Sequence, residues 1–550
     1  MSLKEDLQKI VTGEVTDDAT SLEVFSKDAS IFEITPQIII APKDTSDIKA
    51  LVKFVSSHPN LSITPRAAGT DMSGGPLSDS IVLDMSKYFN QVIEVGTDYA
   101  TTQPGVYYRD FEKETLKKNL LLPCYTASRE ICTVGGMVAN NSAGEKTLTY
   151  GQTERWVNEL RVIFSDGNEY LVKPLSQSEL DKKISQSDFE GNLYKKLYQL
   201  ININQQLIQT AKPTTSKNAS GYYLWNVWDG KTFDLTKLIV GSQGTLGIIT
   251  EIKFKLIKPT THSKLLVIFL KDLKNLGIIV NRVLENKPES FESYDDYTLK
   301  IATQYIPEII KVMHPANILS LLLSFIPEIL ITLFSGFPKL VLISEFTGDS
   351  EEEVQQKCFT TQKSLEEFKL TTRITTDDTD AKKYWTVRRE SFNLLRRHSN
   401  NLRTAPFIDD IVVNPEVLSE FLPKLRSILN KHKLIYTIAG HVGNGNFHII
   451  PLMDFTKSNT PKIIFELSSQ VFNLVKEYQG SFTGEHNDGL IRGPYLPLMY
   501  GEKMYQLFKE VKNIFDERNI FNPNKKVGAT FEYSLNHIVD HHNQLHPTGS

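Results

Sequence analysis

Residues 65–75 read Pro-Arg-Ala-Ala-Gly-Thr-Asp-Met-Ser-Gly-Gly, and two more glycine-rich stretches follow in the first half of the chain. They run from Gly135-Gly136 through Gly144 and Gly151, and over Gly241-Ser242-Gln243-Gly244-Thr245-Leu246-Gly247. None has the spacing of a Walker loop or a Rossmann fingerprint. Backbone NH groups that converge in glycine-rich turns bind phosphate, and Ser and Thr hydroxyls add donors. Tight turns between strands explain each stretch alone, but three together predict a long cofactor with a pyrophosphate.

Two short runs near the end of the chain combine histidine, glutamate and glycine. They are Gly440 to His448 and Gly484-Glu485-His486. Imidazole and carboxylate are ligands that zinc or manganese accepts readily, so the pair of runs predicts a metal-assisted redox or hydrolytic site. A single histidine is more often an ordinary loop or core residue. Asp409-Asp410, which open the run Ile411-Val412-Val413, are expected to be solvated or strand-end structural carboxylates.

Composition excludes several classes of function. With 550 residues, two to four domains are expected. The 61 basic and 65 acidic residues give a net charge of -4, which offers no electrostatic footprint for nucleic acid. Cys124, Cys132 and Cys358 fit neither a disulfide framework nor an iron–sulfur motif, which predicts a reducing compartment. The first ten residues read as a charged amphipathic helix rather than a signal peptide, so we expect a cytoplasmic protein.

The pattern of apolar residues predicts α+β structure throughout. In the first half, short β-rich runs such as 38–42 and 238–240 alternate with helical patterns at 45–55 and 190–207. The glycine clusters stop near Ile257-Lys258-Pro259-Thr260, where we place a domain boundary. Beyond it, strand-like and helical runs predict a sheet covered by helices.

The stretch from Ile318 to Phe334 is densely apolar but is interrupted by Pro327-Glu328. A spanning helix needs about 20 predominantly apolar residues, and a central carboxylate costs several kcal/mol there. A membrane crossing is therefore not expected. Two interpretations stay open: a buried hairpin of short helices, or a patch for a partner or for peripheral contact with the inner membrane face.

The five motifs, in this order, resemble the FAD-linked oxidoreductases of the vanillyl-alcohol oxidase and p-cresol methylhydroxylase type. They look most like the branch with D-lactate and D-2-hydroxyglutarate dehydrogenases and the glycolate oxidase flavin subunit. The resemblance runs from about residue 30 to about residue 530. Each motif alone is weak evidence, whereas five in order are specific.

The resemblance implies an α+β FAD-binding fold of two subdomains with an inserted α+β substrate or cap domain. The corresponding ranges are 1–258 for the FAD-binding domain, 259–484 for the cap domain and 485–550 for a segment that returns to the FAD domain. Matching positions that would contact FAD are Arg66, Gly69, Thr70, Ser73, Gly74, Gly135, Gly136, Asn140, Gly144, Gly241, Thr245, Ile248 and Asn522. Lys525 belongs to the same terminal motif as Asn522. No histidine stands in 135–151, so we expect non-covalent FAD.

The same resemblance assigns the chemistry. His441, His448 and Glu485 would bind the divalent ion, zinc or manganese, and His486 would take the hydroxyl proton. Arg388 matches the arginine that forks onto the substrate carboxylate, although its neighbours Arg389, Arg396 and Arg397 also suit an ordinary helix surface. The sequence departs from the family at Asn444, where aspartate is usual, at Gln243, where glutamate is usual, and at Asn487-Asp488, where Gly-Ile is commoner. Because a carboxylate is the better acceptor for imidazole NH, Asn444 is expected to weaken the support of a ligand histidine.

These features predict an FAD-dependent, metal-assisted dehydrogenase of a small D-2-hydroxy acid, D-lactate-like or longer. With no cysteine cluster and no nicotinamide fingerprint, electrons are expected to pass to a separate acceptor: a quinone, a cytochrome, an electron-transfer flavoprotein or an iron–sulfur subunit. Two alternatives stay open. One is a flavin electron-relay subunit without its own substrate chemistry, and the other is an FAD enzyme like alkyl-glycerone-phosphate synthase.

Overall fold

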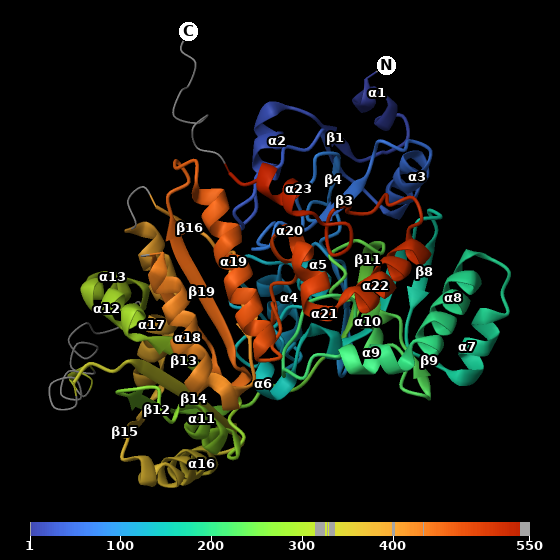
Figure 1. Ribbon diagram of the computed structural model, residues 1–550. Helices are drawn as coiled ribbons and strands as arrows, with labels where there is room; N and C mark the ends of the chain where they lie inside the picture. The colour runs from blue at the N-terminus through green and yellow to red at the C-terminus, as the bar shows by residue number, and fades with distance from the viewer. Residues whose placement is uncertain are drawn as a thin grey trace.

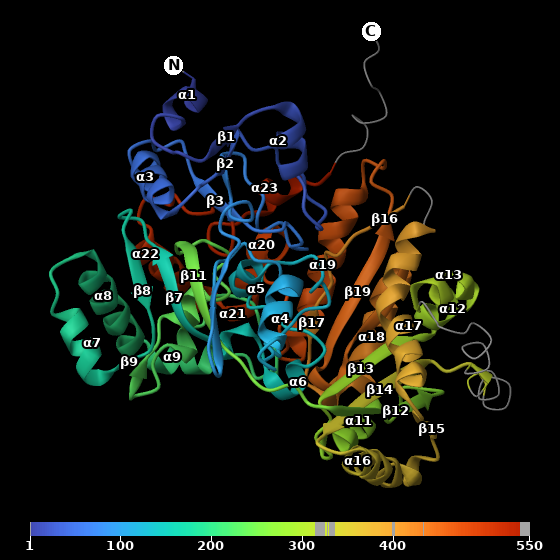
Figure 2. The same cartoon turned by 180° about the vertical axis from the view of Figure 1, so that it is seen from behind.

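The computed structural model describes residues 2–313, 325, 326, 328, 336–398, 402–432 and 434–539. Its α+β architecture, predicted from the sequence, is confirmed. Figures 1 and 2 show the N-terminal half, drawn in blue to green, beside a sheet and its helices drawn in yellow to orange. The candidate functional site lies between them.

The first sheet ends at the first glycine-rich loop. Its strands, in the order β1-β2-β4-β3, are β1 (Glu14–Thr16), β2 (Ile38–Ala41), β4 (Ile81–Asp84) and β3 (Ile63–Arg66). Strands β2, β4 and β3 are parallel, and β1 is antiparallel to β2. Helix α3 (Thr45–Ser56), capped by Asp44, buries Ile48, Leu51 and Val52. The chain then leaves the carboxyl end of β3 directly into residues 69–75.

The second sheet is antiparallel and carries the other two glycine-rich stretches. Its strands, in sheet order, are β5 (Val92–Val95), β6 (Tyr99–Thr102), β11 (Ile248–Lys255), β7 (Val157–Ile163) and β8 (Glu169–Val172). Helix α5 (Val134–Asn140) begins at the second stretch, where the Thr133 hydroxyl accepts a hydrogen bond from Gly136 NH. It ends at Asn141, which has a left-handed φ of 51°.

Two element predictions in this half need correction. The helix expected over 190–207 is two helices, α8 (Phe189–Ile203) and α9 (Gln205–Ala211), because Asn204 between them is not helical. The strand expected over 238–240 belongs mostly to helix α10 (Thr236–Ile239). A short apolar run without turn signals cannot distinguish a strand from a buried helical turn.

The third sheet occupies the C-terminal half. Its path is β15 (Thr371–Ile374), β12 (His262–Leu270), β14 (Leu340–Gly348), β13 (Ser290–Asp295), β18 (Ile435–His441), β19 (Asn446–Met453) and β16 (Arg403–Thr404), with β17 (Ile411–Val412) also paired to β19. Neighbouring strands along this path pair antiparallel. Because side chains alternate along a strand, Leu266 and Ile268 enter one core cluster, while Leu265 and Val267 enter another.

Helices cover both faces of this sheet. The face with Leu266 packs on α11 (Leu276–Leu284), α16 (Glu351–Ser364), α18 (Leu418–Lys431) and α19 (Thr460–Glu477). The face with Leu265 packs on α12 (Asp296–Gln304), α13 (Ile306–Met313) and α17 (Asp378–Arg397). The sheet is thus buried on both sides, and polar side chains on it need specific partners.

The C-terminal segment returns to the N-terminal half. Figure 1 shows α22 (Glu502–Phe515) and α23 (Phe531–Asn536), in red, beside blue and green elements. Phe521 forms a parallel bridge with Ile63, and Ile538 an antiparallel bridge with Phe32. The sheet changes between Lys255, the end of β11, and His262, the start of β12. The boundaries 1–258, 259–484 and 485–550 remain predictions.

Most of the stretch from Ile318 to Phe334 lies outside the described residues, so the choice between a buried hairpin and a surface patch stays open. In the part of the chain that is described, every helix is too short or too polar to cross a membrane.

Candidate active site

A cavity joins the glycine-rich loops to the Glu485-His486 turn. Six of the predicted cofactor positions line it: Arg66, Gly69, Thr70, Gly135, Gly136 and Asn140. Gln243, Gly244 and Gly247 of the third stretch line it as well, and so do Glu485 and His486. The loops from two sheets and the predicted catalytic turn therefore face one space.

The other predicted cofactor positions lie behind this lining. Ser73, Gly74, Gly144, Gly241, Thr245, Ile248 and Asn522 are outside the lining set. The Ser73 hydroxyl donates to Asp71 Oδ2 at 2.7 Å, and the Thr245 hydroxyl lies 2.6 Å from the Tyr222 hydroxyl. The Asn522 amide donates to the backbone oxygens of Gly75 at 2.9 Å and Gln243 at 2.7 Å, which ties two of the loops together. These side chains shape the loops.

Ile248 lies outside the cavity lining. It begins β11, where its side chain is fully buried in a core cluster with Ile63 and Ile163. Its neighbour Ile249 lines the cavity instead. Because adjacent strand residues point to opposite faces, only one of the two side chains can reach the cofactor space.

Asp71 and Gln243 are organising residues whose role the sequence did not reveal. Asp71 accepts hydrogen bonds from Ser73, from Gly75 NH at 2.7 Å and from the Asn140 amide at 2.7 Å. Gln243, at a left-handed φ of 53°, donates to the Ser73 hydroxyl at 3.1 Å and accepts from Gly489 NH at 2.9 Å. An amide both donates and accepts, which explains how glutamine serves where a glutamate is usual.

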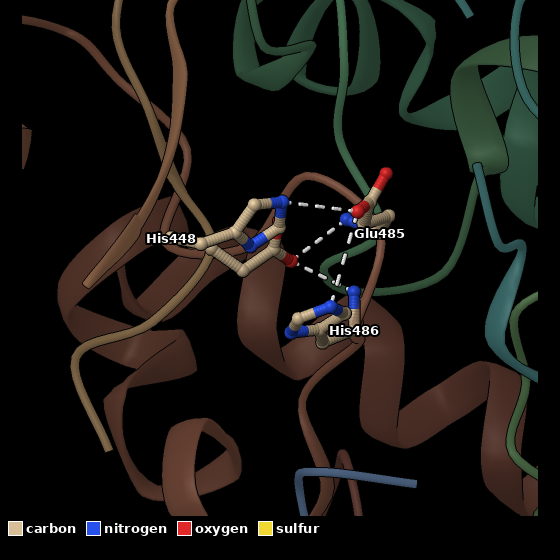
Figure 3. A group of neighbouring side chains, drawn as sticks. His448, Glu485 and His486 are labelled. Atoms are coloured by element: carbon tan, nitrogen blue, oxygen red, sulfur yellow. Dashed lines mark hydrogen bonds and ion pairs between the residues drawn. The ribbon is translucent and has the colours of Figure 1, made fainter. Parts of the chain in front are cut away.

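Strand register places two of the predicted metal ligands on one face of the third sheet. His441 ends β18 and pairs with Asn446, and His448 on β19 pairs with Ala439. Paired residues on neighbouring strands share a face, and so do residues two apart on one strand. His448 pairs with Ala439, which lies two residues before His441, so the two histidine side chains point the same way. Glu485 and His486 approach from the turn that precedes α20 (Gly489–Arg492). Figure 3 shows His448, Glu485 and His486 converging.

The three imidazoles surround one carboxylate oxygen. Nε2 of His441 and Nε2 of His448 each lie 3.3 Å from Glu485 Oε1, and Nε2 of His486 lies 3.9 Å from it. Burial alone would raise the pKa of Glu485, but Lys217, His441 and His448 outweigh it and hold this pKa well below its usual range. The four predicted residues are thus one cluster.

Carboxylates contact the opposite nitrogen of each imidazole. His441 Nδ1 lies 2.5 Å from Glu292 Oε1, His448 Nδ1 lies 3.1 Å from Asp409 Oδ1, and His486 Nδ1 lies 2.8 Å from Asp409 Oδ2. Burial opposes a charged His448, yet Asp409 and Glu485 raise its pKa to about 10. Burial likewise opposes a charged His486, and Asp410 and Asp409 raise its pKa. These contacts orient every Nε2 toward Glu485.

Asp409 and Asp410 directly precede β17 and are fully buried, so of the two expectations solvated carboxylates are wrong and strand-end structural carboxylates agree with the structure. Burial would raise the pKa of Asp409, but His486 and His448 hold it below its usual range. Asp410 Oδ2 accepts from the NH groups of Glu485 and His486, both at 2.7 Å. Its Oδ1 accepts from the Asn446 amide at 2.9 Å. Asp409 orients imidazoles and Asp410 fixes the backbone of the turn, and sequence spacing gave no signal for either role.

Two basic side chains complete the cluster. Arg388 contacts Glu292 Oε2 through Nη2 at 3.1 Å and through Nε at 3.2 Å. Burial would raise the pKa of Glu292, but His441 and Arg388 lower it overall. Lys217, which the sequence interpretation missed, is fully buried and lies 2.8 Å from Glu485 Oε2. It stands in a polar loop far from both histidine motifs, and only the fold brings it there.

The departures from the family have structural roles. The Asn444 amide donates to the Ser216 hydroxyl at 2.9 Å, while the supporting carboxylates of the histidines are Glu292 and Asp409. Asn444 thus contacts the loop of Ser216, and its effect on a ligand histidine stays a prediction. Asn487, at a left-handed φ of 68°, donates to the backbone oxygen of Gly241 at 2.9 Å. Asp488 forms a buried ion pair of 2.9 Å with Lys526 and links the turn to the C-terminal segment.

The donor set fits a divalent ion. Ligand atoms ~2.1 Å from a tetrahedral ion lie ~3.4 Å from one another, close to the 3.3 Å that separates Glu485 Oε1 from two imidazole nitrogens. Each imidazole also has a carboxylate on its other nitrogen, which is the arrangement typical of metal-binding histidines. The residues whose ligand atoms all lie within 4.8 Å of one another are Asp410, His448, Glu485 and His486, a group that does not contain His441. The oxygens of Asp410 already accept from the backbone and Asn446, so we assign it a structural role.

Sequence comparison agrees with this geometry. The profile of an FAD binding domain matches residues 36–171, and that of the C-terminal domain of FAD linked oxidases matches residues 260–526. The chain belongs to the FAD-linked oxidase family. The two profiles together match most of the chain. The first ends within β8, and the second begins at residue 260, just before β12 of the third sheet. Membership supports FAD as the cofactor of the cavity.

Curated proteins similar to this chain carry the names of a dehydrogenase and of an oxidase subunit. D-2-hydroxyglutarate dehydrogenase of Pseudomonas putida is 26% identical over 93% of this chain and 50% of its own length. The enzyme of that name from Escherichia coli K12 is 27% identical over 95% and 51%. The chain thus spans about half the length of these two relatives. Glycolate oxidase subunit GlcD of Bacillus subtilis is 27% identical over 95% of this chain and 96% of its own.

Solved structures confirm the fold. p-Cresol methylhydroxylase aligns with a TM-score of 0.67 and 14% identity over 96% of both chains. Alkyldihydroxyacetonephosphate synthase aligns with a TM-score of 0.65 and 16% identity over 95% of this chain and 84% of its own. At these identities the likeness establishes architecture alone.

Proposed function

We propose that this FAD-linked oxidase family member is a dehydrogenase that oxidises a D-2-hydroxy acid, D-lactate-like or longer, to the 2-oxo acid. One observation carries the proposal: Glu485 and His486 line the cavity that the glycine-rich loops also line, and His441 and His448 contact Glu485 beside it. Such a site offers the proton acceptor, the charge stabiliser and the hydride acceptor that alcohol oxidation requires.

His486 is the proposed base. Its Nδ1 lies 2.8 Å from Asp409 Oδ2, and its Nε2 is on the side of Glu485. The hydroxyl proton of the substrate would pass to this nitrogen while the C2–H bond gives up its hydride. FAD, when bound without a covalent link, supplies the acceptor for that hydride.

His441, His448 and Glu485 are the proposed ligands of zinc or manganese. Such an ion, when bound, lowers the pKa of the substrate hydroxyl and stabilises the developing alkoxide. Arg388 is the proposed partner of the substrate carboxylate. Its Nε and Nη2 are directed at Glu292, so that residue would fix the guanidinium plane while Nη1 meets the substrate.

The proposal extends to the route of the electrons. We expect transfer to a separate acceptor, namely a quinone, a cytochrome, an electron-transfer flavoprotein or an iron–sulfur subunit, in a cytoplasmic or peripherally membrane-bound setting. The FAD-binding, cap and C-terminal ranges 1–258, 259–484 and 485–550 remain part of this proposal.

Anaerobic mixing of the flavin-loaded protein with a panel of D- and L-2-hydroxy acids tests the function. We expect one D-acid to bleach the flavin absorbance, and prior removal of metal with a chelator to slow bleaching by ~100-fold or more, because Lewis-acid stabilisation is worth several kcal/mol. Added Zn²⁺ or Mn²⁺ should restore the rate. If no 2-hydroxy acid bleaches the flavin, the dehydrogenase proposal fails and an electron-relay subunit becomes the better interpretation.

A further inference from the structure

We infer that Lys217 is a positioning residue that makes Glu485 a one-oxygen ligand of the metal ion. The inference rests on the proposed function, because it concerns how the candidate ligand Glu485 is held. Lys217 Nζ lies 2.8 Å from Glu485 Oε2. The other oxygen, Oε1, is the one that the imidazole nitrogens of His441 and His448 approach at 3.3 Å.

The buried environment of Lys217 requires a partner of opposite charge. The residue is 0% exposed, and an unpaired buried ammonium costs several kcal/mol. Its ammonium donates to Glu485 and to the Asn446 side-chain oxygen, which it reaches at 3.1 Å. Asn446 in turn donates to Asp410 Oδ1 at 2.9 Å. Lys217 is therefore connected both to the Glu485 carboxylate and to the group that fixes the backbone of Glu485.

The loop that carries Lys217 is itself fixed to the site. The Ser216 hydroxyl donates to the Asn444 backbone oxygen at 3.3 Å and accepts from the Asn444 amide at 2.9 Å. On the other side, Ala219 NH donates to the Thr483 backbone oxygen at 2.9 Å. The ammonium thus approaches Glu485 from a loop that is attached to both histidine-bearing segments.

The two oxygens of the Glu485 carboxylate therefore have different partners. A free carboxylate can bind an ion through one oxygen or through both. With Lys217 on Oε2 through a charge-assisted hydrogen bond, only Oε1 is left for an ion between the imidazoles. Loss of the ammonium leaves a buried carboxylate that is free to rotate, so the preorganised donor set is lost.

Direct measurement of ion affinity tests the inference. We would strip the flavin-loaded protein with a chelator, titrate it with Mn²⁺ alone, and follow free Mn²⁺ by electron paramagnetic resonance. Lys217→Met should weaken Mn²⁺ binding, raising its dissociation constant by ~10–100-fold, the range typical for partners of metal ligands. Lys217→Gln keeps a polar donor without the charge, and its dissociation constant should fall between those of the wild type and Lys217→Met.

Lys512→Met is the matched control. Lys512 is 6% exposed and pairs with Asp516 at 2.5 Å, so the substitution also removes a buried ammonium from a carboxylate. We expect it to lower the unfolding temperature and to leave the Mn²⁺ dissociation constant within about twofold of the wild type, since residues that share no partner act independently and Lys512 binds Asp516 and the backbone oxygens of Thr245 and Phe521. The flavin spectrum reports folding in every variant.

The possible results distinguish the positioning role of Lys217 from the existence of the metal site. If Lys217→Met and Lys217→Gln retain flavin and bind Mn²⁺ as tightly as the wild type, Lys217 is merely structural and the inference is overturned. It is also overturned if Lys512→Met weakens binding as much as Lys217→Met, or if Lys217→Met does not fold and Lys217→Gln binds normally. If the stripped wild type binds neither Mn²⁺ nor Zn²⁺, the metal site of the proposed function falls, and this inference falls with it.

Discussion

The two sides of the candidate active site are built in different ways. On the cofactor side, the cavity wall consists largely of glycine-rich backbone and small side chains, such as Gly69 and Gly135. On the substrate side, charged groups alternate: Lys217 meets Glu485, and Arg388 meets Glu292. The first side depends on shape and the second on charge balance. Substitutions on the two sides should therefore fail for different reasons.

The largest effect is expected on the charged side, at His486. Replacing His486 with Ala removes the proposed base, so flavin reduction by the preferred D-2-hydroxy acid should slow by ~10²–10⁴-fold, the usual contribution of general base catalysis. Bound FAD should remain, because the cavity wall is mostly backbone. Stopped-flow reduction kinetics measure the change. His58→Ala, at an exposed position, serves as the control and should reduce at the wild-type rate.

Substituting Asp409 with Asn tests whether orientation matters as much as chemistry. This carboxylate contacts Nδ1 of both His448 and His486. An amide cannot balance two imidazoles, so we expect a ~10–100-fold loss of activity together with weaker metal retention. Steady-state assays with an artificial electron dye and metal analysis check both effects. An Asp409→Asn enzyme with normal metal content and normal turnover would contradict the orienting role.

On the cofactor side, a pair of neighbouring glycines separates packing from direct contact with FAD. A Cβ on Gly135 would lie 2.4 Å from Pro104 Cβ and 2.6 Å from Pro104 backbone oxygen, whereas a Cβ on Gly136 would meet nothing closer than 3.6 Å. Gly135→Ala should lower the free energy of unfolding by ~1–3 kcal/mol. Gly136→Ala should change the free energy of unfolding of the flavin-free protein by less than ~0.5 kcal/mol.

Both alanine variants should retain less FAD, since both positions line the cavity. Thermal unfolding with and without added FAD, together with flavin absorbance per protein, gives the two quantities. Equal unfolding free energies for the two variants would show that the close contact with Pro104 is readily relieved.

The smallest effect concerns a buried carboxyl group on the cofactor side, that of Asp28. Burial, together with the nearby Asp71, raises the pKa of Asp28 to about 7. Asp28 Oδ2 is enclosed and has no hydrogen-bond partner among the described residues. Between about pH 4 and pH 7 the folded protein holds a proton that the unfolded chain has lost, so the free energy of unfolding falls as pH rises through this window.

Asp28→Asn should abolish the fall in the free energy of unfolding that ionisation of Asp28 causes. We expect the variant to be more stable than the wild type by ~1–2 kcal/mol at pH 8 and equally stable at pH 4. Denaturant unfolding at the two pH values measures the difference. Asp229→Asn is the control, because backbone NH groups of Thr232 and Lys231 lower the pKa of Asp229, and its loss should not stabilise the protein at pH 8. If the free energy of unfolding changes by the same amount between pH 4 and pH 7 in the wild type and in Asp28→Asn, Asp28 does not cause the pH dependence.

Much of this protein was predictable from residue types in order. Glycines with Ser and Thr neighbours indicated the loops of the cofactor cavity, and glycine-framed His441, His448, Glu485 and His486 indicated the histidine and glutamate cluster. These signals are local, since glycine tolerates the turns in which a backbone approaches a phosphate, and the protein ligands of zinc are imidazole, carboxylate and thiolate groups. The α+β class followed from the same local periodicities.

Tertiary structure decided what those local signals could not contain. Asp409, Glu292 and Lys217 belong to separate strands and loops, and only the register of the third sheet and the fixed loop around Ser216 bring them against the histidines and Glu485. Ile249 lines the cavity and Ile248 lies in the core because adjacent residues of β11 point to opposite faces, and the sequence did not show which face is which. The sequence shows which ionisable side chains the protein has. The tertiary structure buries some of them, and each buried charge then needs a partner of opposite charge, which is how the cluster is assembled.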